Sequence, residues 1–466
     1  MPSLSGINLS LNALLAHSQA MEVIEHNVAN ANTAGYHRQE AVLRTTTPAN
    51  LSAMDNWIGG GMRGTGVEVA SIKRFSLEFF DTRFRSITSE TAESNTKSGV
   101  LGQLEISLAE TGADGLLVKM DAFWSSWQQL SADPSNTSLR AKLIDESSAL
   151  VQSFNRRANQ MMVLRTDQNL MVSQRVEEIN SASQRIAGLN AEISRVISVG
   201  EQPNDLLDER DRLLDRLSEI AGATSHIQDN GEVIVSISGH MLVTGHNALK
   251  LQTVADPAND NLLRVEWQVS GQSFQANHGE LAGLLDVRDK IIPAQQQGLD
   301  DLAAELMGQV NSVHSTGFGL DGTTALNFFT GTDALSMRLN SALTLENIAA
   351  SSIANAPGQG DLAMQISELQ HSKVMNGGTV TLNGFYNKQI TQLGLEVQRS
   401  QIDAHNKGLV QSAMGQQRES TAGVNLDEEA ANLAKYQRAY QAAARVMTVY
   451  DEMLERIING LGVGGR

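Results

Sequence analysis

The chain has 466 residues, of which 41% are hydrophobic and only 4% aromatic, and its formal net charge is −17. An acidic chain without clustered Lys, Arg and stacking rings lacks the surface that follows a phosphate backbone, which argues against nucleic acid as a partner. The chain contains no cysteine, which excludes disulfides and thiolate metal sites. It also has no run of about 18 consecutive apolar residues, the length that a membrane-spanning helix needs.

Near the N-terminus, apolar residues recur every three or four positions, with the register passing through Ser18 and Glu25. This heptad pattern predicts a helix that buries a narrow stripe against one partner helix. No Lys or Arg precedes Arg38, so we expect either a cytosolic protein or one that leaves the cell without cleavage of a signal peptide. The stripe consists of Leu4, Ile7, Leu11, Leu14, Met21 and Val28.

The segment NVANANTAGYHRQE, residues 27–40, follows this stripe. Its Asn and Gly residues tolerate left-handed backbone and end helices, and Gly35 is the expected cap. We expect the Tyr36 ring to fold over the last helical turn. The side chains of Asn27, Asn30 and Thr33 would then bond free backbone groups at the corner.

The next part of the chain is glycine-rich and leads into a predicted strand at 67–72. Gly59, Gly61 and Gly64 match GxGxxG, but no strand precedes them and no helix follows, so a flexible loop is the preferred interpretation.

From 77 to 220 the pattern is helical, with breaks near 112–115, 133–134 and 200–203. In the helix predicted at 204–220, we expect Asn204 to cap the N-terminal end and Asp208 to pair with Arg212 one turn away. The run DERD, 208–211, alternates with arginines and is interpreted as a solvated, self-neutralising face. The apolar positions of this helix are Leu206, Leu213, Leu217 and Ile220.

Alternating β-branched residues predict a small β-rich module at 222–278. Helical periodicity returns at 280–317 and again at 361–375 and 387–420. The last predicted helix runs from 426 to 461, capped by Asn425, with Glu428 placed to close a capping box. Its stripe consists of Leu433, Tyr440, Ala444, Met447, Leu454, Ile458 and Leu461.

The predicted fold is mainly α, with the terminal helices paired as a coiled coil, a central elongated helical bundle and the small β-rich module. We expect three domains: 1–50 with 425–466, 51–221 with 281–424, and 222–280. One two-helix seam leaves further apolar side chains uncovered, which indicates assembly with neighbouring subunits. These side chains are Leu9, Leu15, Ile24 and Ile457.

Motifs for catalysis and cofactor binding are missing from the sequence. It holds no HExxH, GxSxG or GxxxxGK[ST], and no two histidines fall at helical metal-ligand spacing. His240 and His246 are interpreted as ordinary polar positions, and Met161, Met162 and Met171 as core filling. We therefore predict no enzyme, no cofactor and no metal.

Four segments resemble one family in the same order along the chain. NVANANTAGYHRQE resembles the N-terminal signature of axial flagellar proteins, and its Arg38–Gln39 pair resembles the hook-associated protein 1 family. NDLLDERDRLLDRLSE, GELAGLLDVRDKIIP with VNSVHSTGFGLDG, and the segment from 425 to 461 resemble further blocks of that family. The N-terminal signature alone is shared with rod and hook subunits, which remain the alternative.

The resemblance implies a secreted structural protein at the hook–filament junction, exported through the flagellar type III channel. A ring of copies would adapt the bending hook to the stiffer filament. The implied partners are other copies, the hook protein, the second junction protein (hook-associated protein 3), and a cytosolic export chaperone on the C-terminal helix. Many relatives carry an insertion after the GLDG-like block, whereas Asp321 here leads within seven residues to Phe328–Phe329, so an extra outer domain is not expected.

Two interpretations of the 27–40 segment follow. It is either only a well-made turn, or Tyr36, His37 and Arg38 contact adjacent subunits. We also expect the chain ends to become ordered only when neighbours arrive.

Overall fold

The computed structural model describes residues 4–46, 64–108 and 112–461, and the described residues group into two compact units. Unit 1 is drawn from 1–88, 179–250 and 409–466, and unit 2 from 89–178 and 251–408. The fold is mainly helical with small sheets, as predicted. The three-domain division expected from the sequence stays a prediction.

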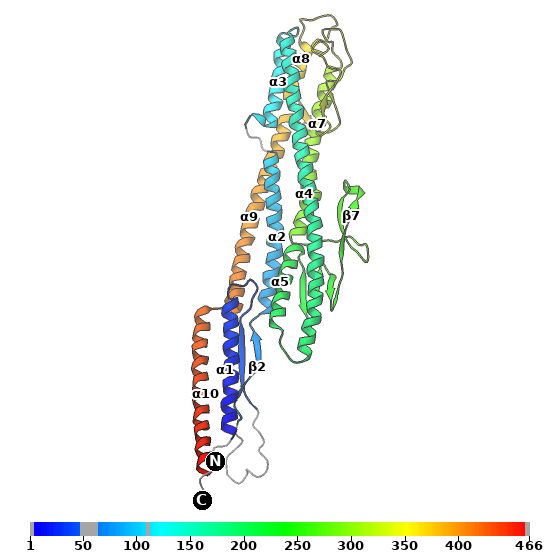
Figure 1. Cartoon of the computed structure of the whole chain (residues 1–466). Helices are drawn as coiled ribbons and strands as arrows, with labels where there is room; N and C mark the ends of the chain where they lie inside the picture. Colours follow the sequence, from blue (N-terminus) through cyan, green and yellow to red (C-terminus); the bar gives the residue numbers. More distant parts are fainter. Residues whose placement is uncertain (1–3, 47–63, 109–111, 462–466) are drawn as a thin grey trace. The chain divides into compact units, whose positions relative to one another are not determined.

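Unit 1 contains the paired ends of the chain, and its α1 and α10 lie side by side in Figure 1. Gly6 lies against Tyr450 and the ring of His17 lies 5.9 Å from that of Tyr436, so the two helices are antiparallel. The helices of unit 1, three of which continue into unit 2, are α1 (Leu4–Asn30), α2 (Glu78–Ser107), α4 (Thr137–Ser198), α5 (Asn204–Ala221), α9 (Leu382–Ala422) and α10 (Leu426–Leu461).

A hairpin of β1 (Gln39–Thr45) and β2 (Val67–Arg74) covers a second side of α1. The strands are antiparallel from Gln39↔Arg74 to Thr45↔Val67, with an irregularity after Val42. Only β2 was predicted, and its predicted bounds were two residues short. The hairpin gives α1 a second partner, so the expectation of burial against one helix only is wrong.

The β-rich region predicted at 222–278 forms two separate sheets. One is an antiparallel four-stranded sheet of unit 1 in the order β3-β4-β5-β6, and the other is the β7–β8 hairpin of unit 2. Asn190 of α4 holds the first sheet, because its side chain donates to Val233 O at 2.9 Å and accepts from Val233 N at 3.0 Å. The strands are β3 (Thr224–Ile227), β4 (Val233–Ile237), β5 (His240–Thr244), β6 (Asn247–Ala248), β7 (Leu251–Asp256) and β8 (Leu262–Trp267).

Unit 2 holds the larger core, where aromatic rings pack edge to face around Phe123 and Trp127. His314 lies inside this cluster, with its ring 5.3 Å from that of Phe328. The elements that complete unit 2 are α3 (Leu116–Ala132), α6 (Glu280–Asp286), α7 (Ile292–His314), α8 (Asp361–Glu368), and the short strands β9 (Phe329–Thr330), β10 (Arg338–Leu339), β11 (Lys373–Met375) and β12 (Val380–Thr381).

Most helix boundaries agree with the predictions. The breaks at 112–115, 133–134 and 200–203 are present, and α10 spans the predicted residues. The helix expected at 361–375 ends earlier, since 373–375 is β11. Met161 is buried as predicted, but Met162 and Met171 are 44% and 41% exposed, so their assignment to the core is wrong.

Within the described ranges, none of the helices has the length and apolar character needed to cross a lipid bilayer. Gly59 and Gly61 of the GxGxxG match lie outside the described residues.

Candidate functional site

The seam between α1 and α10 is the first part of the candidate site. The buried positions of α1 include Ala16, Ala20, Val23 and Ile24, which are displaced around the helix from the predicted stripe. Ala20 and Val23 pack with Ala41 of β1, so the hairpin decides which face of α1 is buried. Ile24 was expected to stay uncovered, and that expectation is wrong because it is only 5% exposed.

The residues predicted for the seam are mostly half-buried, and some are exposed. Gly6 approaches Tyr450 so closely that a Cβ at this position would lie 2.4 Å from the ring, which explains a glycine at that level. The half-buried set is Ile7, Leu14, Met21, Leu433, Ala444, Met447, Leu454 and Ile457; the exposed set is Leu9, Leu11, Leu15, Val28, Tyr440 and Ile458. The side chains of Leu4 and Leu461 lie outside the described part of the chain.

Asn27, which is fully buried, binds three segments at the corner where α1 ends. Its Oδ1 accepts from the Gln39 N–H at 2.9 Å and from the Tyr36 hydroxyl at 2.7 Å. Its Nδ2 donates to Gln39 O at 2.8 Å and to Glu429 Oε2 at 3.0 Å. We call this set of bonds the Asn27 clasp; it joins α1, β1 and α10.

The other residues of the 27–40 segment shape the corner. Tyr36 folds back onto the last turn of α1, as its bond to Asn27 requires. Burial raises the pKa of Tyr36, and the charges of Asp205, Asp208 and Glu429 raise it further, so the hydroxyl stays a donor. Asn30 Nδ2 donates to His26 O at 3.0 Å, and exposed Thr33 bonds the Asn30 side chain. Gly35 has a φ of +79° but lies five residues beyond the helix end, so it turns the chain and is not the helix cap.

Arg38 connects the corner to both C-terminal helices. Its Nε donates to Glu429 Oε1 at 2.7 Å and its Nη1 to Glu428 Oε2 at 3.0 Å. Its backbone N–H donates to Ala422 O at 2.8 Å. Asn425 caps α10 as predicted, with its Oδ1 accepting from Asp427 N at 3.0 Å. The Glu428 carboxylate, expected in a capping box, accepts from Arg38.

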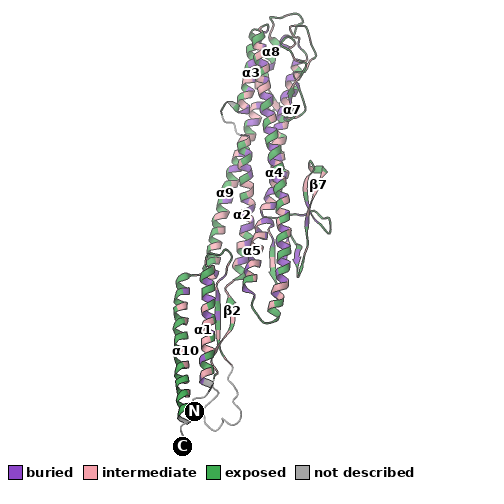
Figure 2. Cartoon of the chain, in the orientation of Figure 1, coloured by how far each residue is buried: buried purple, intermediate pink, exposed green. Residues whose placement is uncertain are grey.

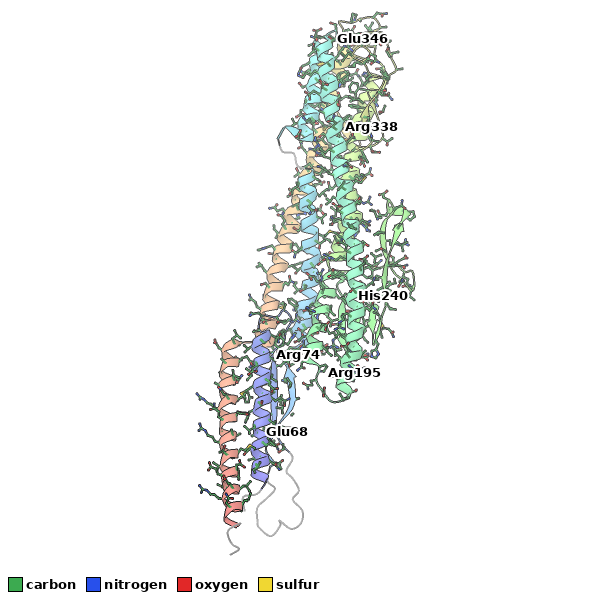
Figure 3. The ribbon with its side chains drawn as sticks, viewed as in Figure 1. Glu68, Arg74, Arg195, His240, Arg338 and Glu346 are labelled. Carbon is green, nitrogen blue, oxygen red and sulfur yellow. The ribbon has the colours of Figure 1, made fainter. Side chains whose placement is uncertain are left out.

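Three carboxylates on one face of α5 form the second part of the site; we call Asp208, Asp211 and Asp215 the α5 carboxylate row. They interleave with arginines from three other elements: Arg74 of β2, Arg85 of α2 and Arg418 of α9. Figure 3 labels Arg74, which lies near the corner end of α1.

Each link of the row is short. Arg74 donates to Asp208 at 2.6 Å and to Asp211 at 2.5 Å. Arg85 donates to Asp211 at 3.0 Å and to Asp215 at 2.7 Å, and Arg418 donates to Asp215 at 2.6 Å.

The corner reaches this row through His37, which is 2% exposed. Its backbone N–H donates to Asp208 Oδ2 at 3.2 Å, and its Nδ1 lies 2.7 Å from Asp208 Oδ1. Gln39 adds a second connection, since its Nε2 donates to Asp205 and its Oε1 accepts from Asn204. The clasp and the carboxylate row are therefore one polar network.

The network corrects the interpretation of the DERD run. Asp208, Arg210 and Asp211 are all buried, and Asp208 pairs with Arg74 where Arg212 was expected. Asn204 is not the cap, because α5 begins at Asn204 itself and Pro203 holds the N-cap position. The Nδ2 of Asn204 donates to Ile72 O at 2.9 Å. The step of three and four between the three carboxylates was the available signal, since it marks one helix face just as apolar spacing does.

We predict that Asn27→Ala lowers the free energy of unfolding by about 2 kcal/mol, because it leaves the buried amide and carbonyl of Gln39 without partners. Chemical denaturation followed by circular dichroism measures the change. Asn32→Ala is the matched control, since Asn32 is exposed and in the same segment. Equal stability of the two variants would contradict the role assigned to the clasp.

The arrangement holds and orients segments of the chain. Among the residues that the structure describes, no group of three or more His, Cys, Asp and Glu side chains is placed to hold a metal ion.

Comparisons with known proteins agree with this architecture. The chain matches the family model "flagellar hook-associated protein FlgK helical domain" over 101–329. It also matches a flagella basal body rod protein model over 7–37 and the C-terminal model of the FlgEFG rod proteins over 416–460.

Relatives match over nearly the full chain. Flagellar hook-associated protein 1 of Bacillus subtilis is 28% identical, with 99% of both chains covered. The protein of the same name from Escherichia coli is 24% identical over 97% of this chain and 99% of its own. The chain belongs to the flagellar hook-associated protein 1 family. The hook junction protein FlgK of Burkholderia pseudomallei has the same fold, with a TM-score of 0.65 at 17% identity over 73% of this chain and all of that one.

Membership in the hook-associated protein 1 family gives the function at a coarse level. The chain is a structural component of the flagellar hook–filament junction, outside the cell, and is not an enzyme. The helical-domain match separates it from rod and hook subunits, because the two terminal models alone describe rod proteins.

Proposed function

We propose that copies of this chain polymerise into a ring between hook and filament, and that this ring adapts one tube mechanically to the other. The observation that carries the proposal is the outer surface of the α1–α10 seam. Among the described residues of α10, Glu429 is the only buried one, and Figure 2 draws this helix as mostly exposed.

Apolar side chains remain uncovered on both helices of the seam. Leu15 of α1 is 61% exposed. On α10, Val446, Val449, Tyr450 and Met453 line an apolar hollow together with the stem of Arg445. A protein that stayed monomeric would gain nothing by exposing two apolar helix faces, whereas neighbouring copies would bury them.

The inner part of the ring would be formed by 1–50 with 425–466. The bundle of 51–221 with 281–424 would lie outside it, and the two separate sheets of 222–280 would project from the bundle. The partners we propose are the hook protein on one side and the second junction protein, hook-associated protein 3, on the other. An export chaperone would cover the apolar face of α10 before assembly. Tyr36, His37 and Arg38 are largely engaged within their own chain, which favours a positioning role for them over direct subunit contact.

We predict that Leu15→Glu prevents the chain from accumulating at hook ends while leaving its fold intact. The added charge meets only solvent in the monomer but would be buried without a partner in the ring. Microscopy of hook ends in cells that carry the variant gives the readout, and circular dichroism of the purified protein checks the fold. Leu15→Met keeps the apolar surface and should assemble. Normal assembly of Leu15→Glu would overturn the proposal.

We also predict weak hydrogen-exchange protection at Leu11 and Met447 in dilute monomer and strong protection in assembled flagella. Ordering one backbone residue costs about 1 to 2 kcal/mol, and the few buried contacts of α10 offset little of this cost until copies meet. Amide exchange read by mass spectrometry measures both states. Strong protection in the monomer would show that the seam is complete without neighbours.

A further inference from the structure

Two helices of unit 2 carry exposed apolar residues with the same seven-residue spacing. On α4, Val163 and Leu170 are 49% and 60% exposed; we call them the α4 stripe. On α9, Leu395 and Ile402 are 48% and 54% exposed; we call them the α9 stripe. Residues seven apart lie on one helix face, so each stripe is a narrow apolar ridge. Because all four side chains remain about half exposed, the stripes do not cover each other within one chain.

Each stripe has one charged residue on the same helix face as its two apolar residues, and these two charges are opposite. Arg165 lies on the opposite side of α4, and Glu396 is displaced to one side of the α9 stripe. Asp167 follows Val163 by four residues and precedes Leu170 by three. Arg399 stands in the same relation to Leu395 and Ile402. Both are exposed, and neither side chain has a hydrogen bond or ion pair to another described residue.

The stripes lie at one level of unit 2. Arg165 Nε of α4 donates to Arg288 O at 3.0 Å. Gln389 Nε2 of α9 donates to Gln295 O at 2.9 Å, seven residues further along the α6–α7 segment. In unit 2, α9 runs parallel to α4 and opposite to α7 (Figure 1). Moving seven residues along α9 from Gln389 therefore brings residue 396 to the level of Arg165, to within about one turn. The two stripes thus lie at the same level along the long axis of these helices.

We propose that in the assembled ring the α4 stripe of one copy packs against the α9 stripe of the next, with Asp167 opposite Arg399. The proposal rests on the proposed function, in that it requires copies to stand side by side. The charges decide the pairing: two α4 stripes would oppose two aspartates and two α9 stripes would oppose two arginines, and like charges repel. The contact therefore joins different faces, and a head-to-tail contact of this kind closes into a ring or continues as a helix. Met162 and Met171, which flank the α4 stripe, provide adaptable side chains for such a contact.

Cross-linking in assembled flagella tests the pairing directly. The chain has no cysteine, so Asp167→Cys with Arg399→Cys introduces the only two thiols. Oxidation of flagella from cells with this variant is expected to give a ladder of multimers on a non-reducing gel, and oxidation of dilute monomer should give none. The matched control is Asp167→Cys with Gln401→Cys, because Gln401 is exposed and next to Ile402 but points to another side of α9. The control should lose the ladder.

Charge reversal provides a second test, which does not depend on assembly of the cysteine variant. Asp167→Arg and Arg399→Asp alone should each reduce the amount of chain at hook ends, and the double variant should restore it. Failure of the double variant to recover, with all three proteins folded by circular dichroism, would overturn the pairing.

The other outcomes separate this inference from the proposed function. If the wild-type chain occupies hook ends but the cysteine pair gives no ladder, only the stripe contact is wrong. A cross-linked product whose mass is not a multiple of the mass of this chain would show that one of the two stripes contacts another flagellar component. This outcome also overturns the pairing. If the wild-type chain forms no ring at hook ends, the proposed function fails first.

Discussion

Asp211→Asn is expected to lower the free energy of unfolding by about 3 to 5 kcal/mol, because it breaks a buried ion network from its centre. The Asp211 carboxylate accepts from both Arg74 and Arg85, and all three side chains are at most about a tenth exposed. The variant keeps the shape of the side chain but leaves both guanidinium groups short of a negative partner. Chemical denaturation followed by far-ultraviolet circular dichroism, with amide exchange in α5, measures the loss.

Acid titration gives a second readout for Asp211. Burial alone would raise its pKa, but the charges of Arg74 and Arg85 outweigh burial and lower the pKa from 3.8 to about 2. Because the folded value lies below the unfolded one, this stability is present above pH 3.8 and is lost as the pH falls towards 2, by about 2 kcal/mol. The variant should lack this part of the acid dependence. Glu219→Gln on the same helix is the control and should cost less than about 1 kcal/mol, since the side chains of Glu219 and its partner Arg216 are 40% and 30% exposed. A similar loss in both variants would contradict the importance of the network.

Unit 2 is expected to lose about 3 kcal/mol of stability between pH 6.5 and pH 4 through His314. Its Nδ1–H donates to Leu326 O at 2.6 Å and its Nε2 accepts from Ala349 N at 3.0 Å, which requires a neutral ring. Burial lowers the pKa of His314 to about 4, and the charge of Arg140 contributes in the same direction. Since the unfolded chain binds the proton more readily, stability is full above pH 6.5 and decreases as the pH falls towards 4.

Tryptophan fluorescence reports this change locally, because Trp124 and Trp127 lie in the same core as His314. His314→Gln should be less stable at neutral pH by about 1 to 3 kcal/mol, yet should show little pH dependence over this window. His371→Gln, at an exposed position, should keep the wild-type slope. An unchanged slope in His314→Gln would remove His314 as the cause.

The sequence predicted the elements with local signals and missed those whose partners are distant. Helix breaks at Asp133–Pro134 and Gly200–Pro203 follow from turn residues at those positions, and the cap of Asn425 follows from its own side chain. The hairpin partner β1 has no such signal, and without it the buried face of α1 was placed on Leu11 and Val28 instead of Ala20 and Val23. The acidic run of α5 was assigned to solvent because its partner arginines lie 126 to 203 residues away.

Asn27 and Glu429, which the clasp joins, are separated by 402 positions in the chain. Because the two residues lie near opposite ends of the chain, this bond can form only in a polypeptide that is present almost in full. A product that terminates before Glu429 therefore lacks the means to close the corner. Closure of the corner is thus coupled to the presence of an almost intact molecule.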